Sequence, residues 1–139
     1  MNELQIVNYL NSDRYTSKHF VGVFARDEII KQILKPGLYV VNTDISSGPG
    51  IHWVCIYVNS NQVDYFDSLG LPPDNFLNFL RRQKKKYLYS TKQLQSTQSD
   101  VCGDYCILYA YFKCRGYSLL DFVNLFTNYV DYNDLMVEL

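Results

Sequence analysis

Four residues whose types act together in nucleophilic catalysis follow one another along the chain: His52, Asp67, Gln95 and Cys102. A cysteine nucleophile needs an imidazole within hydrogen-bonding reach, and the imidazole needs a carboxylate that fixes its tautomer and stabilises its charged form. A glutamine amide can join the backbone N–H of the cysteine in binding an oxyanion. The set predicts covalent attack on a carbonyl group, with Cys102 as nucleophile, His52 as base, Asp67 as orienting acid and Gln95 in the oxyanion hole.

The nucleophile is expected at the first turn of a buried helix over residues 102–114, because this run is apolar nearly all round. Ser99 or Asp100 can cap its start. The partial positive charge and unpaired N–H groups of a helix N-terminus favour a thiolate over a thiol. Gly103 is expected to leave room beside the sulfur of Cys102 for a substrate backbone.

The base and the acid are expected on neighbouring strands. Segments 51–58 and 62–68 are rich in β-branched and aromatic residues and are separated by Asn-Ser-Asn, which predicts a tight hairpin. With the turn near residues 59–62, His52 and Asp67 become cross-strand neighbours, with Cβ atoms about 4.5–5.5 Å apart.

The remaining segments predict one α+β domain over residues 1–139, with a mixed or antiparallel central sheet and helices on its faces. Ser118 and Asn133 are the expected caps of the last two helices. Further strands are expected over 37–43 and 86–91. Helices are expected over 3–10, 26–34, 72–83, 118–130 and 133–139.

Composition excludes several classes of protein. The 139 residues are 47% hydrophobic and carry a formal net charge of −1, so no overall field draws the chain to nucleic acid or to a membrane. There is no signal-peptide pattern and no long apolar run, which predicts a soluble protein without a membrane partner. The four cysteines lack the density of a secreted disulfide scaffold, so free thiols inside a cell are expected.

Other interpretations of the same residues remain open. Cys102, Cys106, Cys114 and His52 could hold zinc, but the cysteine spacing is not that of a zinc knuckle, and neither a metal nor another cofactor is predicted. A disulfide between Cys102 and Cys106 is disfavoured because the two lie one helical turn apart. Cys55, Cys106 and Cys114 are interpreted as core thiols. Gln98 competes with Gln95 for the oxyanion hole.

A basic segment, Arg-Arg-Gln-Lys-Lys-Lys, interrupts this nearly neutral chain. One interpretation is structural: the segment is the solvated end of a helix, where positive charges interact favourably with the helix dipole. Weak DNA binding is the alternative. The side chains concerned are Arg81, Arg82, Lys84, Lys85 and Lys86.

Three motifs together resemble the adenovirus-type (adenain-like) cysteine endopeptidases, a group distantly similar to SUMO-deconjugating proteases. They are Gly-Ile-His-Trp, Tyr-Phe-Asp-Ser-Leu-Gly and Val-Cys-Gly-Asp-Tyr-Cys, and the resemblance covers residues 20–115. It implies the adenain-like fold, the same roles for the four site residues, and a structural place beside the histidine for Trp53. The shortness of the chain resembles the compact forms of virus-like DNA transposons and related viruses.

The resemblance also implies a substrate: a structural precursor protein of a virus or virus-like element, cleaved after small residues, often glycine, during capsid maturation. Action in the host cytoplasm or nucleus follows, with packaging in the virion as a further option. Three alternatives stay open on the same fold: removal of a ubiquitin-like modifier such as SUMO, acyl transfer by the same triad, and an inactive interaction module.

Overall fold

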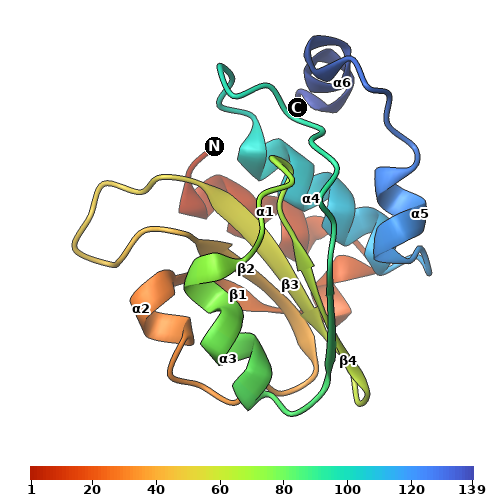
Figure 1. Ribbon diagram of the computed structural model, residues 1–139. Helices are drawn as coiled ribbons and strands as arrows, with labels where there is room; N and C mark the ends of the chain where they lie inside the picture. The colour runs from red at the N-terminus through yellow and green to blue at the C-terminus, as the bar shows by residue number, and fades with distance from the viewer.

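A five-stranded mixed sheet forms the centre of the computed structural model, which describes residues 1–139 (Figure 1). The spatial order of the strands is their order in the chain. The outer pairs β1–β2 and β4–β5 are parallel, and the two inner pairs are antiparallel. The strands are β1 Phe20–Ala25, β2 Gly37–Asn42, β3 Trp53–Val58, β4 Gln62–Phe66 and β5 Lys86–Tyr89.

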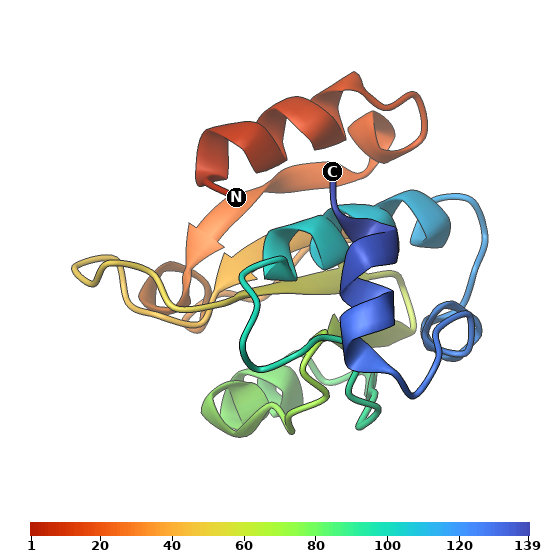
Figure 2. The same cartoon turned by 90° about the horizontal axis from the view of Figure 1, so that it is seen from above.

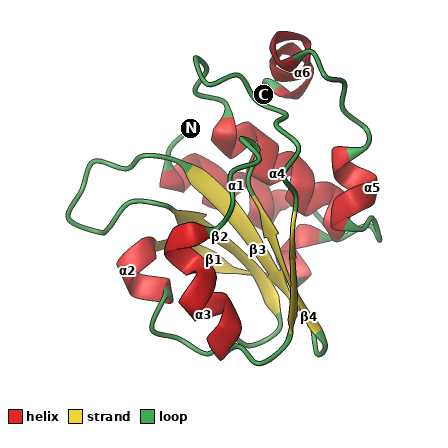
Figure 3. Ribbon diagram, viewed as in Figure 1, coloured by secondary structure: helices red, strands yellow, loops and turns green.

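Helices cover both faces of the sheet, as the view from above shows (Figure 2). One face carries α1 Glu3–Ser12, α4 Cys102–Lys113, α5 Leu119–Val123 and α6 Val130–Val137. The other carries α2 Arg26–Ile29 and α3 Leu77–Arg82. Short 3₁₀ turns at Thr16–Lys18 and Asp74–Phe76 complete the structure (Figure 3). The predicted α+β class and mixed sheet are confirmed.

Successive side chains along the strands point to opposite faces of the sheet and so belong to two separate hydrophobic clusters. Leu38 and Val40 of β2 face α1 and α4, whereas Tyr39 and Val41 of the same strand face α2 and α3. This is the two-residue period of a strand that is buried on both faces. The packing presses α4 onto the middle of the sheet, which fixes the position of its first residue, Cys102.

A buried ion pair holds the other end of α4. Lys113 Nζ lies 2.7 Å from Asp64 Oδ2 on β4, and both side chains are largely buried. Asp64 Oδ1 also accepts a hydrogen bond of 2.6 Å from Gln62 Nε2. The carboxylate therefore has partners on both oxygens, as a buried charge requires.

Several local predictions were wrong. Residues 20–25, for which no strand was predicted, form the edge strand β1, and the helix expected over 26–34 is the four-residue α2. The helix expected over 118–130 ends at Val123, although Ser118 does cap it by accepting a hydrogen bond from the Asp121 N–H. Asn133 is no cap: it lies inside α6, fully buried, and its amide bonds to Thr127 and Leu94.

The helices of this fold are short. None has the length and apolar character needed to cross a lipid bilayer.

Candidate active site

The histidine and the aspartate meet at one end of the central hairpin. His52 directly precedes β3 and Asp67 directly follows β4. His52 Nε2 lies 2.7 Å from Asp67 Oδ1, and the two side chains are only 11% and 5% exposed. In the observed register, which pairs Cys55 with Phe66, they are diagonal rather than directly opposite neighbours. An offset of two residues keeps both side chains on the same face of the hairpin, where they meet.

The Asp67–Gly70 turn holds the carboxylate in place. Asp67 Oδ1 also accepts a hydrogen bond of 2.8 Å from the Leu69 N–H, and the Gly70 N–H donates to Asp67 O at 2.9 Å. Gly70 has a φ of +68°, a left-handed conformation that glycine adopts without strain. The turn therefore fixes the acid before any substrate binds.

We expect Gly70→Ala to destabilise the fold by more than about 2 kcal/mol, since left-handed backbone alone costs roughly 1–2 kcal/mol. The new Cβ would lie 2.7 Å from the carbonyl group of Lys92 and could not be accommodated without moving the backbone. Urea unfolding measures the loss. Gly116→Ala is the matched control, because Gly116 also has a positive φ, +99°, but open space around it. Equal losses in the two variants would contradict the proposed clash.

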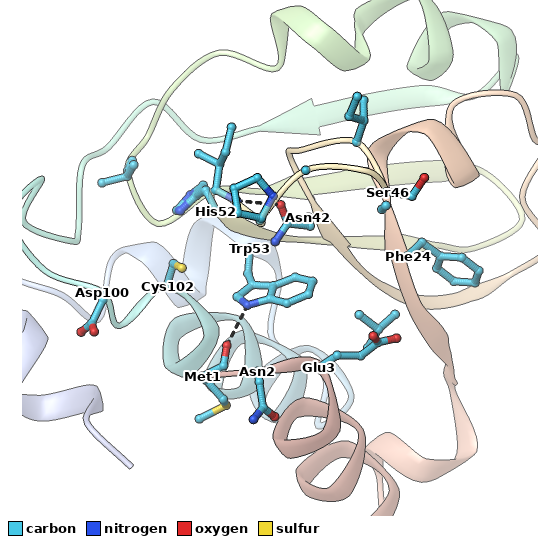
Figure 4. Close-up of a pocket in the computed structure, with 18 of the residues that line it drawn as sticks. Met1, Asn2, Glu3, Phe24, Asn42, Ser46, His52, Trp53, Asp100 and Cys102 are labelled. Atoms are coloured by element: carbon cyan, nitrogen blue, oxygen red, sulfur yellow. Dashed lines mark hydrogen bonds between the residues drawn. The ribbon is translucent and has the colours of Figure 1, made fainter.

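Cys102 is the first residue of α4, and His52 lies beside it in the cleft (Figure 4). Burial disfavours the thiolate, but a hydrogen bond from His52, the N–H groups of Trp53 and Gly103, and the charge of the imidazolium outweigh it. The net effect lowers the pKa of the Cys102 thiol below its usual value. The expected caps of the helix are not used: the N-cap is Val101, and Ser99 bonds instead to the carbonyl of Ser96.

The imidazole shows the opposite change. Burial disfavours its charged form, yet hydrogen bonds to Asp67 and Cys102 and their negative charges raise the pKa of His52 to about 9. The two shifts favour an ion pair of thiolate and imidazolium at neutral pH. Among the four cysteines this environment is unique: burial raises the pKa of Cys55 and Cys106 well above normal, and that of Cys114 to about 11.

Gln95 lies beside these residues, and Gln98 does not. Gln95 lines the cleft that contains His52 and Cys102, whereas Gln98 is exposed outside it. Ser68 Oγ donates to Gln95 Oε1 at 2.6 Å, and Gln95 Nε2 donates to the backbone oxygen and the hydroxyl of Ser99, both at 3.2 Å. Of the two candidate glutamines, Gln95 is therefore the one that shares the cleft with His52 and Cys102.

The cleft has a volume of about 730 Å³ and runs past His52 and Cys102 toward the end of β1. The loop of residues 45–51 forms one wall, and the N-terminus of α1 contributes Met1, Asn2 and Glu3 to another (Figure 4). Exposed Ile51 and half-exposed Trp53 lie along it. It is an open groove lined by both polar and apolar side chains.

Met1 is a part of the site that sequence reasoning missed. Its carbonyl oxygen accepts a hydrogen bond of 3.0 Å from Trp53 Nε1, which joins α1 to the residue after His52 (Figure 4). Gly103 is buried beneath them: a Cβ there would lie 3.0 Å from Met1 Cβ and 3.4 Å from Trp53 Cδ1. The prediction that Gly103 leaves room for substrate was wrong, because the protein's own side chains fill that space.

The interpretation of the cysteines as metal ligands finds no support in the geometry. No group of three or more His, Cys, Asp or Glu side chains is placed to hold a metal ion. All four cysteines are free thiols. What the structure brings together is the set His52, Asp67, Gln95 and Cys102.

No family model matches the sequence, but individual proteins do. A cysteine protease from a tick isolate of African swine fever virus is 32% identical over 100 residues, covering 61% of this chain and 36% of the relative. A protein of a South African isolate of the same virus, named SUMO-1 cysteine protease, is 28% identical over 116 residues, covering 73% and 42%. The chain thus spans about two fifths of the length of the curated relatives it matches.

Solved structures define the class of fold. A crystal structure of the African swine fever virus pS273R protease superposes with a TM-score of 0.70 at 18% identity, covering 96% of this chain and 63% of that one. AvrA gives a TM-score of 0.53, also at 18% identity, covering 97% and 56%. The chain therefore has the adenain-like cysteine protease fold that was predicted. A second crystal structure of the viral pS273R protease superposes with a TM-score of 0.54 at 28% identity, covering 70% of this chain and 41% of that one, so the chain is similar to this protease in both sequence and structure.

Proposed function

We propose that this chain is a cysteine endopeptidase that cleaves structural precursor proteins of a virus or virus-like element after small residues, often glycine. The observation that carries the proposal is the pairing of Cys102, its pKa lowered, with His52, its pKa raised, at an open cleft. The similarity to viral cysteine proteases and the resemblance to adenain-like enzymes support it.

The proposed reaction begins with the Cys102 thiolate. It attacks the carbonyl carbon of the scissile peptide, a C–S bond forms, and the oxyanion is bound by Gln95 Nε2–H and the Cys102 N–H, which has no intrahelical partner. The His52 imidazolium then gives its proton to the leaving amine as the C–N bond breaks. Water, deprotonated by His52, hydrolyses the thioester and releases the thiolate. Asp67 stabilises the imidazolium throughout.

A second candidate is removal of SUMO or another ubiquitin-like modifier, which the name of the South African relative favours. The two functions are distinguished by offering two substrates: peptides with glycine before the scissile bond, and a SUMO precursor with a C-terminal extension. Cleavage of the peptides, detected by mass spectrometry, supports the endopeptidase. Cleavage of the SUMO precursor alone supports deconjugation. Cleavage of neither, with Cys102 still reactive, supports an inactive module of the same fold.

The pH profile of hydrolysis follows from the ion pair. The active form holds a thiolate and a protonated imidazole, so kcat/KM is expected to rise with pH as Cys102 loses its proton. It is expected to fall again as His52 loses its proton, at about pH 9. Initial rates from pH 4 to 10 measure both limbs. Activity that still rises between pH 9 and pH 10 would contradict the assignment of His52 as proton donor.

The proposed site of action is a reducing compartment inside the host cell, because the proposed nucleophile is a thiolate and all four thiols are free.

Weak DNA binding by the basic segment remains a further proposal. Arg82 donates to the carbonyl of Ile30 and Lys85 to that of Asn59, which leaves Arg81, Lys84 and Lys86 for contacts with phosphates. Three such contacts predict an affinity for duplex DNA that falls about 40-fold between 50 and 200 mM salt, at ~0.9 counterions released per phosphate. Fluorescence anisotropy measures it. A salt-independent affinity would contradict binding through this segment.

A further inference from the structure

A buried hydroxyl group lies between two residues of the candidate site. Ser68 follows Asp67 in the Asp67–Gly70 turn and is 1% exposed. Its Oγ donates a hydrogen bond of 2.6 Å to Gln95 Oε1, across 27 positions of sequence. Ser68 is not among the residues that line the cleft, so it acts on a bound substrate only through Gln95.

The two ends of the Gln95 amide have different partners. Oε1 accepts from Ser68 Oγ and from no other group, while Nε2 faces the carbonyl oxygen of Ser99, which can only accept. Gln95 itself is 2% exposed, so water cannot replace a lost partner freely. Without the Ser68 hydroxyl, Oε1 would be a buried acceptor with no donor, and the amide orientation would be held only by the longer contacts of Nε2 with Ser99.

The backbone of Ser68 supplies a separate contact. Its carbonyl oxygen accepts from the Leu94 N–H at 2.9 Å and from the Gln95 N–H at 3.0 Å. Removing the hydroxyl leaves these main-chain bonds in place. A substitution at Ser68 can therefore disturb the orientation of the Gln95 side chain without releasing the segment that carries it.

We propose that Ser68 is a positioning residue: by binding Oε1 it keeps Nε2 of the Gln95 amide on the side of Ser99, which lines the cleft, where an N–H can be offered to an oxyanion. The role of Gln95 as donor rests on the proposed protease function. The orientation of its amide does not. On this proposal, one turn sets two catalytic groups at once, because Asp67 orients His52 and the adjacent Ser68 orients Gln95.

The kinetic test is a double-mutant cycle on a fluorogenic peptide with glycine before the scissile bond. Ser68→Ala is expected to lower kcat about tenfold with little change in KM, and Gln95→Ala to lower kcat roughly 10²- to 10³-fold. The double variant should match Gln95→Ala, since both changes remove one interaction. A tenfold loss from Ser68→Ala that persists in the Gln95→Ala background would show a merely structural role and overturn the proposal.

The direct test observes the amide itself. The side-chain N–H signals of Gln95 are assigned in ¹⁵N–¹H spectra by their loss in Gln95→Ala, and Ser68→Ala is expected to shift or broaden them. Ser12→Ala, which removes a hydroxyl on α1 far from the cleft, is the matched control and should change neither signals nor kcat. Unchanged Gln95 signals in Ser68→Ala would overturn the proposal.

If Ser68→Ala does not fold, Ser68→Cys replaces it in both tests. The thiol has nearly the size of the hydroxyl but is a weaker hydrogen-bond donor, so kcat should fall less than tenfold and the Gln95 signals should shift less than expected for Ser68→Ala. If the wild-type protein hydrolyses no peptide, the proposed protease function is contradicted. The proposal for Ser68 is then still tested by the Gln95 side-chain signals.

Discussion

Replacing His52 with alanine is expected to slow iodoacetamide labelling of Cys102 at pH 6 by one to two orders of magnitude. The wild-type thiol has a lowered pKa that depends on its hydrogen bond and charge interaction with His52. Without the imidazole the thiol would return toward the free value of about 8.5, at which roughly 0.3% is thiolate at pH 6. Intact mass and peptide mapping of each cysteine from pH 4 to 9 measure the change.

The other residues of the chain provide the controls for this experiment. Cys55 and Cys106 are buried, and Cys114, with a pKa of about 11, should label only under alkaline conditions. His19→Ala changes an exposed histidine outside the cleft and should leave the profile of Cys102 unchanged. If Cys102 labels at the same rate in wild type and His52→Ala, the ion pair is wrong.

Cys102→Ser is expected to reduce peptide hydrolysis by at least ~10⁴-fold, because loss of the nucleophile removes the covalent pathway. The exchange of sulfur for oxygen changes volume little, so unfolding in urea should stay within about 1 kcal/mol of wild type. Hydrolysis of the glycine peptide, followed by mass spectrometry, measures the loss.

Cys106→Ser is the matched control for the nucleophile. Cys106 is buried one helical turn further along α4 and takes no part in the proposed reaction. The folded Cys106→Ser variant should hydrolyse the peptide at the wild-type rate. Comparable activity in Cys102→Ser and wild type would show that another residue performs the chemistry.

The parts of the fold that could be predicted are those with a strong local pattern. The β3–β4 hairpin has β-branched strands and a three-residue polar turn, and α4 is an uninterrupted apolar run, so both were placed within a few residues. Because the hairpin also sets which residues face each other, the proximity of His52 and Asp67 could be inferred from the spacing of the two residues about its turn.

The remaining features depend on contacts between distant segments. β1 contains Gly22 at an irregularity in its pairing with β2, which hides the alternation of a strand. The hydrogen bond of Trp53 to Met1 spans 52 positions. Its acceptor is a backbone oxygen, which every residue has, so the sequence contains no pattern that predicts it. The cap of α4 was missed because Ser99 turns back toward Ser96 and Gln95 instead of the helix.

The position of α4 also determines when the protein becomes reactive. During synthesis the hairpin with His52 and Asp67 emerges first, and Cys102 follows it on a separate element that must still pack against the sheet (Figure 1). Until α4 is in place, Cys102 has an ordinary thiol, because His52 and the Trp53 N–H, which lower its pKa most, belong to the strand side of the site. In a nascent or partly folded chain Cys102 is therefore an ordinary thiol, and its pKa is lowered only when the fold is complete.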